Sequence, residues 1–191
     1  MLKLEVVPER IEAYDISNYG DEHITAGMIV SVSGKYKKSD YKVFKIRTTD
    51  GQNDYGAMTE AVRRRIENAQ QGEESFLPLP DLILLDGGKG HVACIKELLA
   101  QMGVDIPVFG MVKDEYHKTR SLCDAENEIS ISKDKELFLF IYKLQEEVHR
   151  FTVSRMSRAK RKTLKTSSLT KIKGVGEAKA KKLLAAFDSL E

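Results

Sequence analysis

The 191-residue chain has apolar and charged fractions of 41% and 31% and a net charge of only +2, which suit one well-cored globular domain with a small appendage. No apolar run approaches the roughly 20 residues that cross a bilayer, and the opening MLKLEVVPER has no secretory apolar segment, so we expect neither a membrane protein nor a secreted one. Two cysteines without CxxC spacing argue against a disulfide framework and favour reduced thiols in the cytoplasm.

The first part of the chain has the composition of β-strands. Residues 10–17, 26–34 and 41–48 are rich in β-branched and aromatic side chains, and the polar KYKKSD separates the last two ranges. A short polar segment between two strand patterns indicates a hairpin turn. We therefore expect these three strands to form an antiparallel meander.

A helix pattern follows the meander. Asn53 or Asp54 is the expected N-cap. The apolar side chains at helical spacing are Tyr55, Met58, Val62 and Ile66. This segment predicts an amphipathic helix.

Strand and helix patterns then alternate. LILLD, which ends at Asp86, and residues 106–113 predict buried strands, with an amphipathic helix closed by Gly103 between them. The polar residues 114–134 have room for a small hairpin, and a long helix pattern begins at Lys135. The order βββαβαβ followed by a helix favours an α/β fold with a mixed sheet flanked by helices, which is the order of ribonuclease H-like domains.

The segment LILLDGGKGH sets an aspartate at the end of an apolar strand and two glycines behind it. A buried carboxylate is costly unless it is paired, protonated or bound to metal, and glycine permits a sharp turn or a close approach. A phosphate loop, a metal site and a plain turn are the alternatives. Neither GxxxxGK[ST] nor GxGxxG is present, which makes a nucleotide-binding loop the poorer explanation.

Three side chains form a candidate metal site. Asp15 lies in the first strand pattern and Asp86 ends the fourth; neighbouring strands lie about 4.8 Å apart, where two carboxylates need a cation. The third group is His149 in QEEVHRF. Gln145 and Glu146 lie on the same helix face, where Glu146 is placed to orient the imidazole or to join a metal shell. Taken singly, each aspartate also suits a strand-end cap, and the histidine suits a satisfied core position.

Five blocks of the sequence resemble those of the UvrC family, the incision subunits of the bacterial UvrABC excision nuclease, and they occur in the same order. The blocks are DIS (15–17), NDYGAMTEAVRRR (53–65), LPDLILLDGGKG (79–90), VKD (112–114) and EEVHRF (146–151). They resemble the C-terminal endonuclease domain of the family. The resemblance implies a ribonuclease H-like endonuclease domain over residues 1–162.

The resemblance also implies an activity and its residues. It places a metal-dependent catalytic site, with Mg²⁺ or Mn²⁺ as cofactor, on Asp15, Asp86 and His149. Arg10 corresponds to an arginine that is associated with the site in the family. The implied reaction is incision of DNA on the 5′ side of a lesion in nucleotide excision repair, within the SOS response, and the implied partner of the full-length protein is UvrB.

Two neighbours of the candidate site depart from the family pattern. Glu146-Glu147-Val148 stands where Asp-Glu-Ala is usual, and His91 stands where glutamine is common. Neither change removes a proposed ligand, but both alter the neighbouring hydrogen bonds. Lys113 and Arg150 are candidates for neutralising the charge of a bound DNA phosphate.

Basic charge is concentrated near the end of the chain. Between Arg150 and Lys182 there are twelve Lys or Arg and one acid, a net +11, so the rest of the chain carries −9, which indicates a polyanionic partner. We expect residues 163–191 to form a partial helix-hairpin-helix that holds the DNA backbone without reading bases. The DNA-binding candidates in it are Lys173, Gly174, Gly176 and Lys179. A solvated helix face and a flexible helix–helix turn are the simpler alternatives.

Two other functions fit the same residues. One is a DNA-binding module without independent catalytic activity. The other is a different ribonuclease H-like nuclease, which needs a third carboxylate in place of His149, and Glu146 is the nearby candidate.

Overall fold

The computed structural model describes residues 4, 6–19, 23–47, 53–113, 119–170, 172, 176, 178–180 and 182–183. The chain divides into two compact units, Met1–Thr152 and Val153–Glu191. In chain order the elements are β1 (Arg10–Tyr19), β2 (His23–Val32), β3 (Lys35–Tyr36), η1 (Lys38–Asp40), β4 (Lys42–Lys45), α1 (Asp54–Gln70), η2 (Glu74–Phe76), β5 (Leu82–Leu85), α2 (Lys89–Gln101), β6 (Val108–Lys113), β7 (Thr119–Cys123), β8 (Glu128–Ser130) and α3 (Lys135–Thr170).

The first unit is built on a mixed sheet of eight strands in the order β3-β2-β1-β5-β6-β7-β8, with β4 paired to β2. β1, β2 and β4 form the predicted antiparallel meander, and the turn between β2 and β4 also contains the short β3 and the 3-10 helix η1. β5 is parallel to both β1 and β6, which requires crossovers, and α1 and α2 supply them. The predicted α/β fold is confirmed, and the hairpin expected in residues 114–134 is β7–β8.

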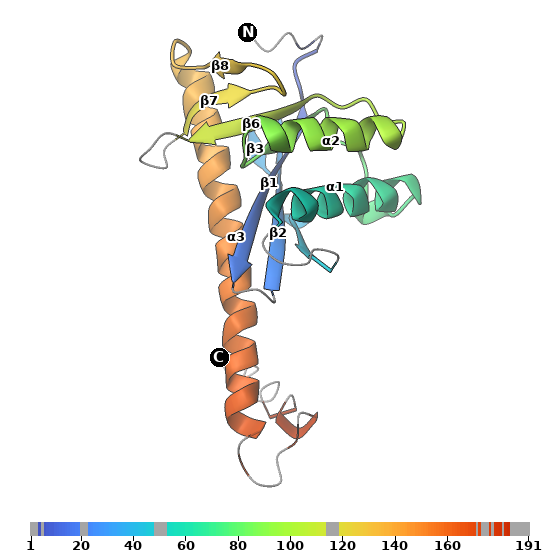
Figure 1. Cartoon of the computed structure of the whole chain (residues 1–191), viewed down its shortest axis with the longest axis vertical. Helices are drawn as coiled ribbons and strands as arrows, with labels where there is room; N and C mark the ends of the chain where they lie inside the picture. The colour runs from blue at the N-terminus through green and yellow to red at the C-terminus, as the bar shows by residue number, and fades with distance from the viewer. Residues whose placement is uncertain are drawn as a thin grey trace. The chain divides into compact units, whose positions relative to one another are not determined.

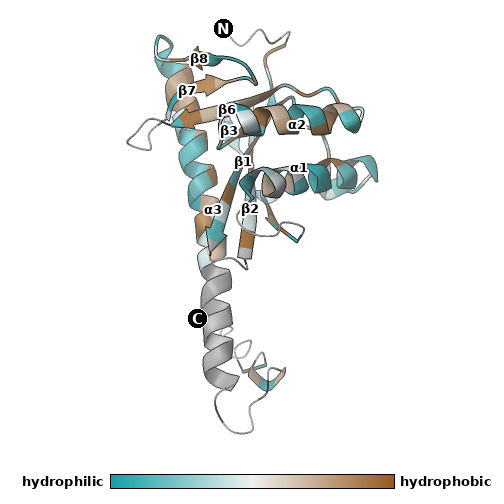
Figure 2. Cartoon of the chain, in the orientation of Figure 1, coloured by the Kyte–Doolittle hydropathy of each residue, from teal (hydrophilic) through white to brown (hydrophobic). Residues whose placement is uncertain are grey.

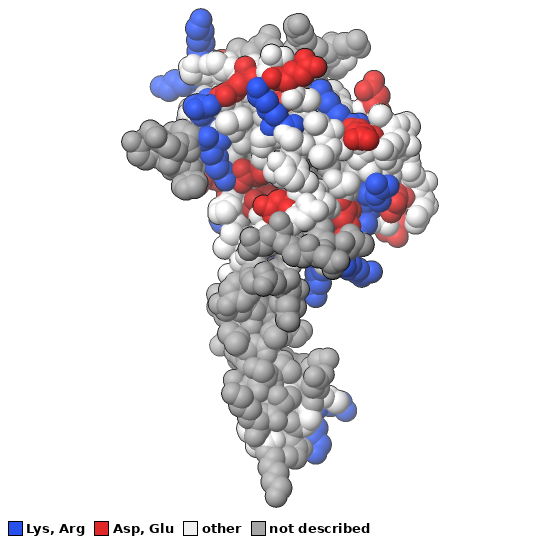
Figure 3. All heavy atoms as spheres, viewed as in Figure 1, with Lys and Arg blue, Asp and Glu red and all other residues white. Residues whose placement is uncertain are grey.

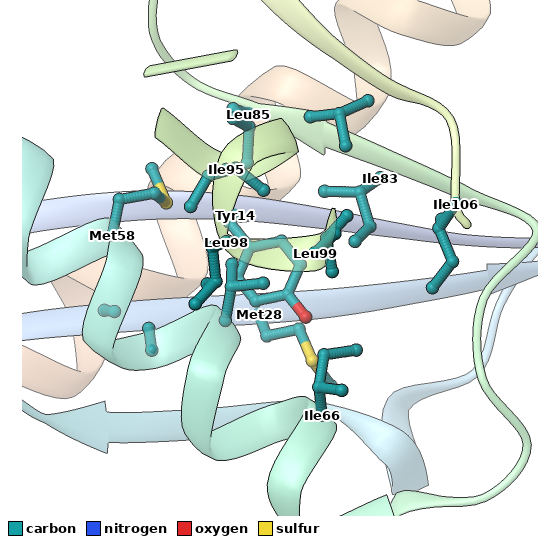
Figure 4. Packing of buried hydrophobic residues seen from close by; sticks show 14 of the residues in the cluster. Tyr14, Met28, Met58, Ile66, Ile83, Leu85, Ile95, Leu98, Leu99 and Ile106 are labelled. Carbon is teal, nitrogen blue, oxygen red and sulfur yellow. The ribbon is translucent and has the colours of Figure 1, made fainter. Parts of the chain in front are cut away.

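Helices cover both faces of the sheet (Figure 1). α1 and α2 lie side by side on one face, and the first-unit part of α3 packs on the other. Successive strand residues point to opposite faces, so Tyr14 of β1 belongs to the α1–α2 core and Ala13 to the core under α3. Figure 4 shows Ile66 of α1 and Leu98 of α2 packed around Tyr14. By the same alternation, Asp15 points toward α3.

The hydropathy of the elements matches these layers (Figure 2). Hydrophobic residues run along β6 and β7, whereas hydrophobic and hydrophilic residues alternate around α1 and α2. All four residues of β5 are buried, as expected for a parallel strand that is covered on both faces.

The ends of α1 and α2 follow their predicted signals. The side chain of Asn53, one of the two cap candidates, accepts a hydrogen bond from the Gly56 N–H at 3.0 Å. α2 ends before Gly103, whose φ of +67° is the left-handed conformation that glycine adopts without strain. Tyr55 differs from the other apolar residues at helical spacing, which are buried: it is 49% exposed because its ring stacks on His91 instead of entering the core.

α3 begins in the first unit and continues into the second. The predicted domain boundary after residue 162 falls inside this helix, whereas the compact units divide at Thr152. The division into residues 1–162 and 163–191 stays a prediction. In the part of the chain that the structure describes, no helix is long and apolar enough to cross a membrane.

Few residues of the expected helix-hairpin-helix are described. The N–H of Ala180 donates to the carbonyl of Gly176 at 2.9 Å, and the described residues that follow Gly176 are helical. Lys179 lies in this helical stretch. Lys173 and Gly174 lie outside the described residues, so the motif stays a prediction.

Candidate metal centre

Two parallel strands place two carboxylates side by side. β1 and β5 pair with Tyr14 opposite Leu85, and the N–H of Asp86 donates to the carbonyl of Tyr14 at 2.8 Å. Asp15 follows Tyr14 in β1, and Asp86 follows Leu85 at the carboxyl end of β5. The strand pairing alone therefore brings the two aspartates together, as neighbouring strand patterns predicted.

α3 brings His149 onto Asp15. The imidazole Nδ1 lies 3.3 Å from Oδ2 of Asp15. This approach depends on Gly27, the residue of β2 that pairs with Asp15. A Cβ at Gly27 would lie 3.0 Å from the Cβ and 3.2 Å from the Cα of Thr152, which follows His149 by about one helical turn. The bare backbone at Gly27 thus sets how closely α3 lies over the sheet.

The Asp15 carboxyl is strongly perturbed. Its pKa is raised from 3.8 to about 7, mainly by burial and in addition by the charge of Asp86, while His149 and Lys113 act in the opposite direction. Among the described residues Oδ2 has no hydrogen-bond partner, because the 3.3 Å contact with His149 lacks hydrogen-bond geometry. A buried carboxylate oxygen in this state needs a proton or a cation.

Asp86 is held through both of its oxygens. Nζ of Lys113 lies 2.7 Å from Oδ2, and Nε2 of Gln145 donates to Oδ1 at 2.8 Å. Lys113 is the last residue of β6, which neighbours β5 in the sheet. Oδ2 of Asp86 therefore already accommodates a positive charge.

These residues fit a divalent cation. Asp15, Asp86 and His149 each offer one ligand atom, and the three atoms lie within 4.8 Å of one another. Two carboxylate oxygens and an imidazole nitrogen form a donor set that suits Mg²⁺ or Mn²⁺. The unpartnered oxygen of Asp15 and the ammonium group at Asp86 both indicate a site that favours positive charge.

Arg10 lies apart from this cluster. Its guanidinium is buried, 2.7 Å from Asp40 and 3.2 Å from Glu12, and Arg65 of α1 contacts the same Glu12 carboxylate at 2.8 Å. The network ties β1 to α1, and its pairing offsets the cost of burying the charges. Since successive side chains of β1 point to opposite faces of the sheet, Arg10 and Glu12 point away from the face on which Asp15 lies. Arg10 was also expected to contact DNA, and this role stays a prediction.

Three neighbours of His149 on α3 have different environments. Arg150 is exposed and pairs with Glu147 at 2.7 Å. Glu146 is exposed and is not a member of the three-residue cluster, so an imidazole and not a third carboxylate completes it. Gln145 is buried against Asp86, although sequence reasoning identified it only as a helix neighbour of His149. Its i−4 spacing from His149 is the signal that pointed to it.

The glycines after Asp86 make room for an aromatic pair. The rings of Tyr55 and His91 stack with centroids 4.3 Å apart and planes at 22°. A Cβ at Gly87 would lie 2.6 Å from Nδ1 of His91, and one at Gly90 would lie 2.8 Å from Cε1 of Tyr55. Close approach of side chains thus explains Gly87 and Gly90 of DGGKG. Burial lowers the pKa of His91.

Comparison with known proteins identifies the family. Residues 1–153 match the family model described as the UvrC RNase H endonuclease domain. The chain belongs to this family. The match contains Asp15, Asp86 and His149 of the candidate metal centre, and the RNase H description agrees with the mixed sheet.

Alignments with curated relatives cover this UvrC-family chain over its whole length. UvrABC system protein C of Acetivibrio thermocellus is 41% identical over 206 residues, and that of Clostridioides difficile is 42% identical over 191 residues. Both alignments cover 100% of this chain but 33% and 30% of the relatives, so the chain spans about a third of their length. The crystal structure of human ENDOV has a TM-score of 0.50 and 9% identity, covering 80% of this chain and 86% of that chain, and is alike in fold alone.

Proposed function

We propose that this chain is the metal-dependent endonuclease part of a UvrC protein, which hydrolyses a DNA phosphodiester on the 5′ side of a lesion in nucleotide excision repair in the cytoplasm. The observation that carries the proposal is the convergence of Asp15, Asp86 and His149 around an unpartnered buried oxygen in a UvrC-family chain. A purely structural role would not explain why two carboxyls lie side by side, one of them with a strongly raised pKa.

The reaction requires the three residues to act together. Asp15, Asp86 and His149 would hold Mg²⁺ or Mn²⁺ through one atom each. When bound, such an ion polarises the scissile phosphate and lowers the pKa of a water molecule. Asp15, whose carboxyl pKa is raised to about 7, would hold the ion in its ionised form, so binding would favour loss of its proton. Lys113, whose ammonium lies at the same site, neutralises charge on the phosphate.

DNA affinity comes from the basic C-terminal segment in this proposal. The net +11 between Arg150 and Lys182 favours phosphate contacts that are sensitive to salt and independent of sequence. On the face of the first unit displayed in Figure 3, basic and acidic side chains are interspersed, so that face offers no uniformly basic surface. The proposed backbone contacts in the C-terminal segment are Lys173, Gly174, Gly176 and Lys179, and Arg150 is a further proposed phosphate contact.

UvrB is the proposed protein partner, and this partnership is proposed for the full-length protein. The relatives are UvrABC system proteins, and their length beyond this chain is about two thirds of the whole. The partner is therefore assigned to UvrC proteins of full length and not to a surface of this chain.

Incision of a 5′-labelled duplex with a single bulky lesion tests the proposal. The whole 191-residue chain is incubated with Mn²⁺ or EDTA, with and without UvrB, beside Asp86→Asn and the exposed control Asp105→Asn. We expect a product on the 5′ side of the lesion that requires metal, disappears in Asp86→Asn and persists in Asp105→Asn. Duplex binding without metal-dependent incision would indicate a DNA-binding module. Preferred cleavage of an RNA–DNA hybrid would indicate a ribonuclease H-type enzyme. Either result overturns the proposal.

A further inference from the structure

Gln145 joins three strands of the sheet to α3 at the candidate metal centre. Its side chain is 1% exposed. Nε2 donates to Oδ1 of Asp86 at 2.8 Å, just after β5, and to the carbonyl of Met111 in β6 at 3.0 Å. Oε1 accepts a hydrogen bond from the hydroxyl of Thr119, the first residue of β7. The amide is thus fully engaged, with partners on three elements that neighbour one another in the sheet.

These partners fix which end of the amide faces Asp86. The carbonyl of Met111 accepts hydrogen bonds and has none to donate, so the nitrogen of Gln145 must face it. The same nitrogen carries the second N–H, which points to Oδ1 of Asp86. A flipped amide would set its oxygen against two acceptors, the Met111 carbonyl and the Asp86 carboxylate. The donor toward Asp86 is therefore determined by the surrounding backbone.

We propose that Gln145 is a positioning residue that fixes the orientation of the Asp86 carboxylate at the candidate metal centre. This inference rests on the proposed function and deepens it. Lys113 contacts the other oxygen, Oδ2, at 2.7 Å, so the two side chains together hold the carboxylate in one orientation. Rotation of the carboxylate would break the Gln145 bond and leave a buried N–H without a partner.

α3 thereby supplies both a ligand and the support for another ligand. Gln145 precedes His149 by four residues, so the two side chains lie on one helix face. His149 reaches Asp15 and Gln145 reaches Asp86. Partners of this kind around metal ligands typically change metal affinity by about 10–100-fold when they are removed.

The hydrogen bond is tested first in the metal-free chain by NMR. The side-chain NH₂ resonances of Gln145, identified by their loss in Gln145→Glu, are expected to exchange slowly with water and to shift in Asp86→Ala. Amide protons that exchange as fast as those of the exposed Gln101 would overturn the proposal, whether or not the protein binds metal.

The consequence for metal is tested by Mn²⁺ binding, with free Mn²⁺ counted by EPR. Gln145→Met keeps the length and removes the donor, and it is expected to weaken Mn²⁺ binding at least tenfold, with incision recovering as Mn²⁺ is raised. Thr119→Val is the matched control: it disturbs the same buried amide without touching Asp86, and its Mn²⁺ affinity is expected to stay within about threefold of wild type.

The outcomes separate this inference from the proposed function. Wild-type affinity in Gln145→Met, alongside lost binding in Asp86→Asn, overturns the role of Gln145 and leaves the metal centre standing. Equal losses in Gln145→Met and Thr119→Val reduce Gln145 to general structural support and also overturn it. A wild-type chain that binds no Mn²⁺ at Asp86 overturns both.

Discussion

Replacing Gly27 with alanine tests whether the spacing between α3 and the sheet controls the metal centre. The added Cβ would overlap Oγ1 of Thr152 and lie 3.0 Å from its Cβ and 3.2 Å from its Cα. Rotating the Thr152 side chain relieves only the first overlap, because the Cα belongs to the helix backbone. To restore ordinary carbon–carbon contact, α3 must move away from β2 by roughly 0.4 Å.

His149 moves with α3 because it lies about one turn before Thr152. Metal–ligand distances tolerate deviations of about 0.2 Å, so a shift of this size predicts a loss of Mn²⁺ affinity of tenfold or more. Overpacking also lowers the free energy of unfolding by about 1–3 kcal/mol. Mn²⁺ titration and urea unfolding measure the two effects, with Gly88→Ala as the control, since a Cβ there meets nothing within 4 Å. Unchanged Mn²⁺ affinity in Gly27→Ala, whatever the stability of the variant, would show that the spacing of α3 does not control the metal centre.

Two further predictions concern the charges buried in the first unit. The pKa of Asp15 is raised to about 7 in the folded metal-free protein, whereas this carboxyl loses its proton near pH 4 in the unfolded chain. Because the folded state holds the proton over this range, the free energy of unfolding should fall by at most about 4 kcal/mol between pH 4 and 7. Asp15→Asn should remove this slope in EDTA, and identical slopes in both proteins would contradict the assignment. Arg65→Met should cost about 3 kcal/mol in urea unfolding, because the fully buried Glu12 loses one of its two cations; a cost under about 1 kcal/mol would show that Arg10 alone suffices.

Much of the fold could be predicted because local patterns and tertiary packing agree. The continuous apolar run at 82–85 identified a strand covered on both faces, and the Asn53 cap and Gly103 marked helix ends that the structure has. The pairing of Asp15 with Asp86 followed from parallel strands whose residues lie far apart in sequence. A carboxylate at the end of a buried strand is visible in the sequence and indicates a nearby partner, because a buried charge requires one.

What the sequence did not reveal depends on packing between distant elements. Tyr55 has helical spacing but stacks on His91, and this depends on where the loop after β5 places that ring. Glu12 meets Arg65 across the α1–β1 packing, so its pairing has no local pattern. Gln145 looked like an ordinary polar helix residue, and its role appears only when β6 and β7 place their backbone and hydroxyl groups against it.

Diffraction from Mn²⁺-soaked crystals of the whole chain, recorded where manganese scatters anomalously, shows whether Asp15, Asp86 and His149 bind one metal ion. We expect an anomalous peak within about 2.0–2.6 Å of a carboxylate oxygen of Asp15, a carboxylate oxygen of Asp86 and an imidazole nitrogen of His149, and no such peak in crystals of Asp86→Asn. A fully soaked wild-type crystal without manganese among these three side chains, or with the ion bound elsewhere on the chain, would contradict this expectation.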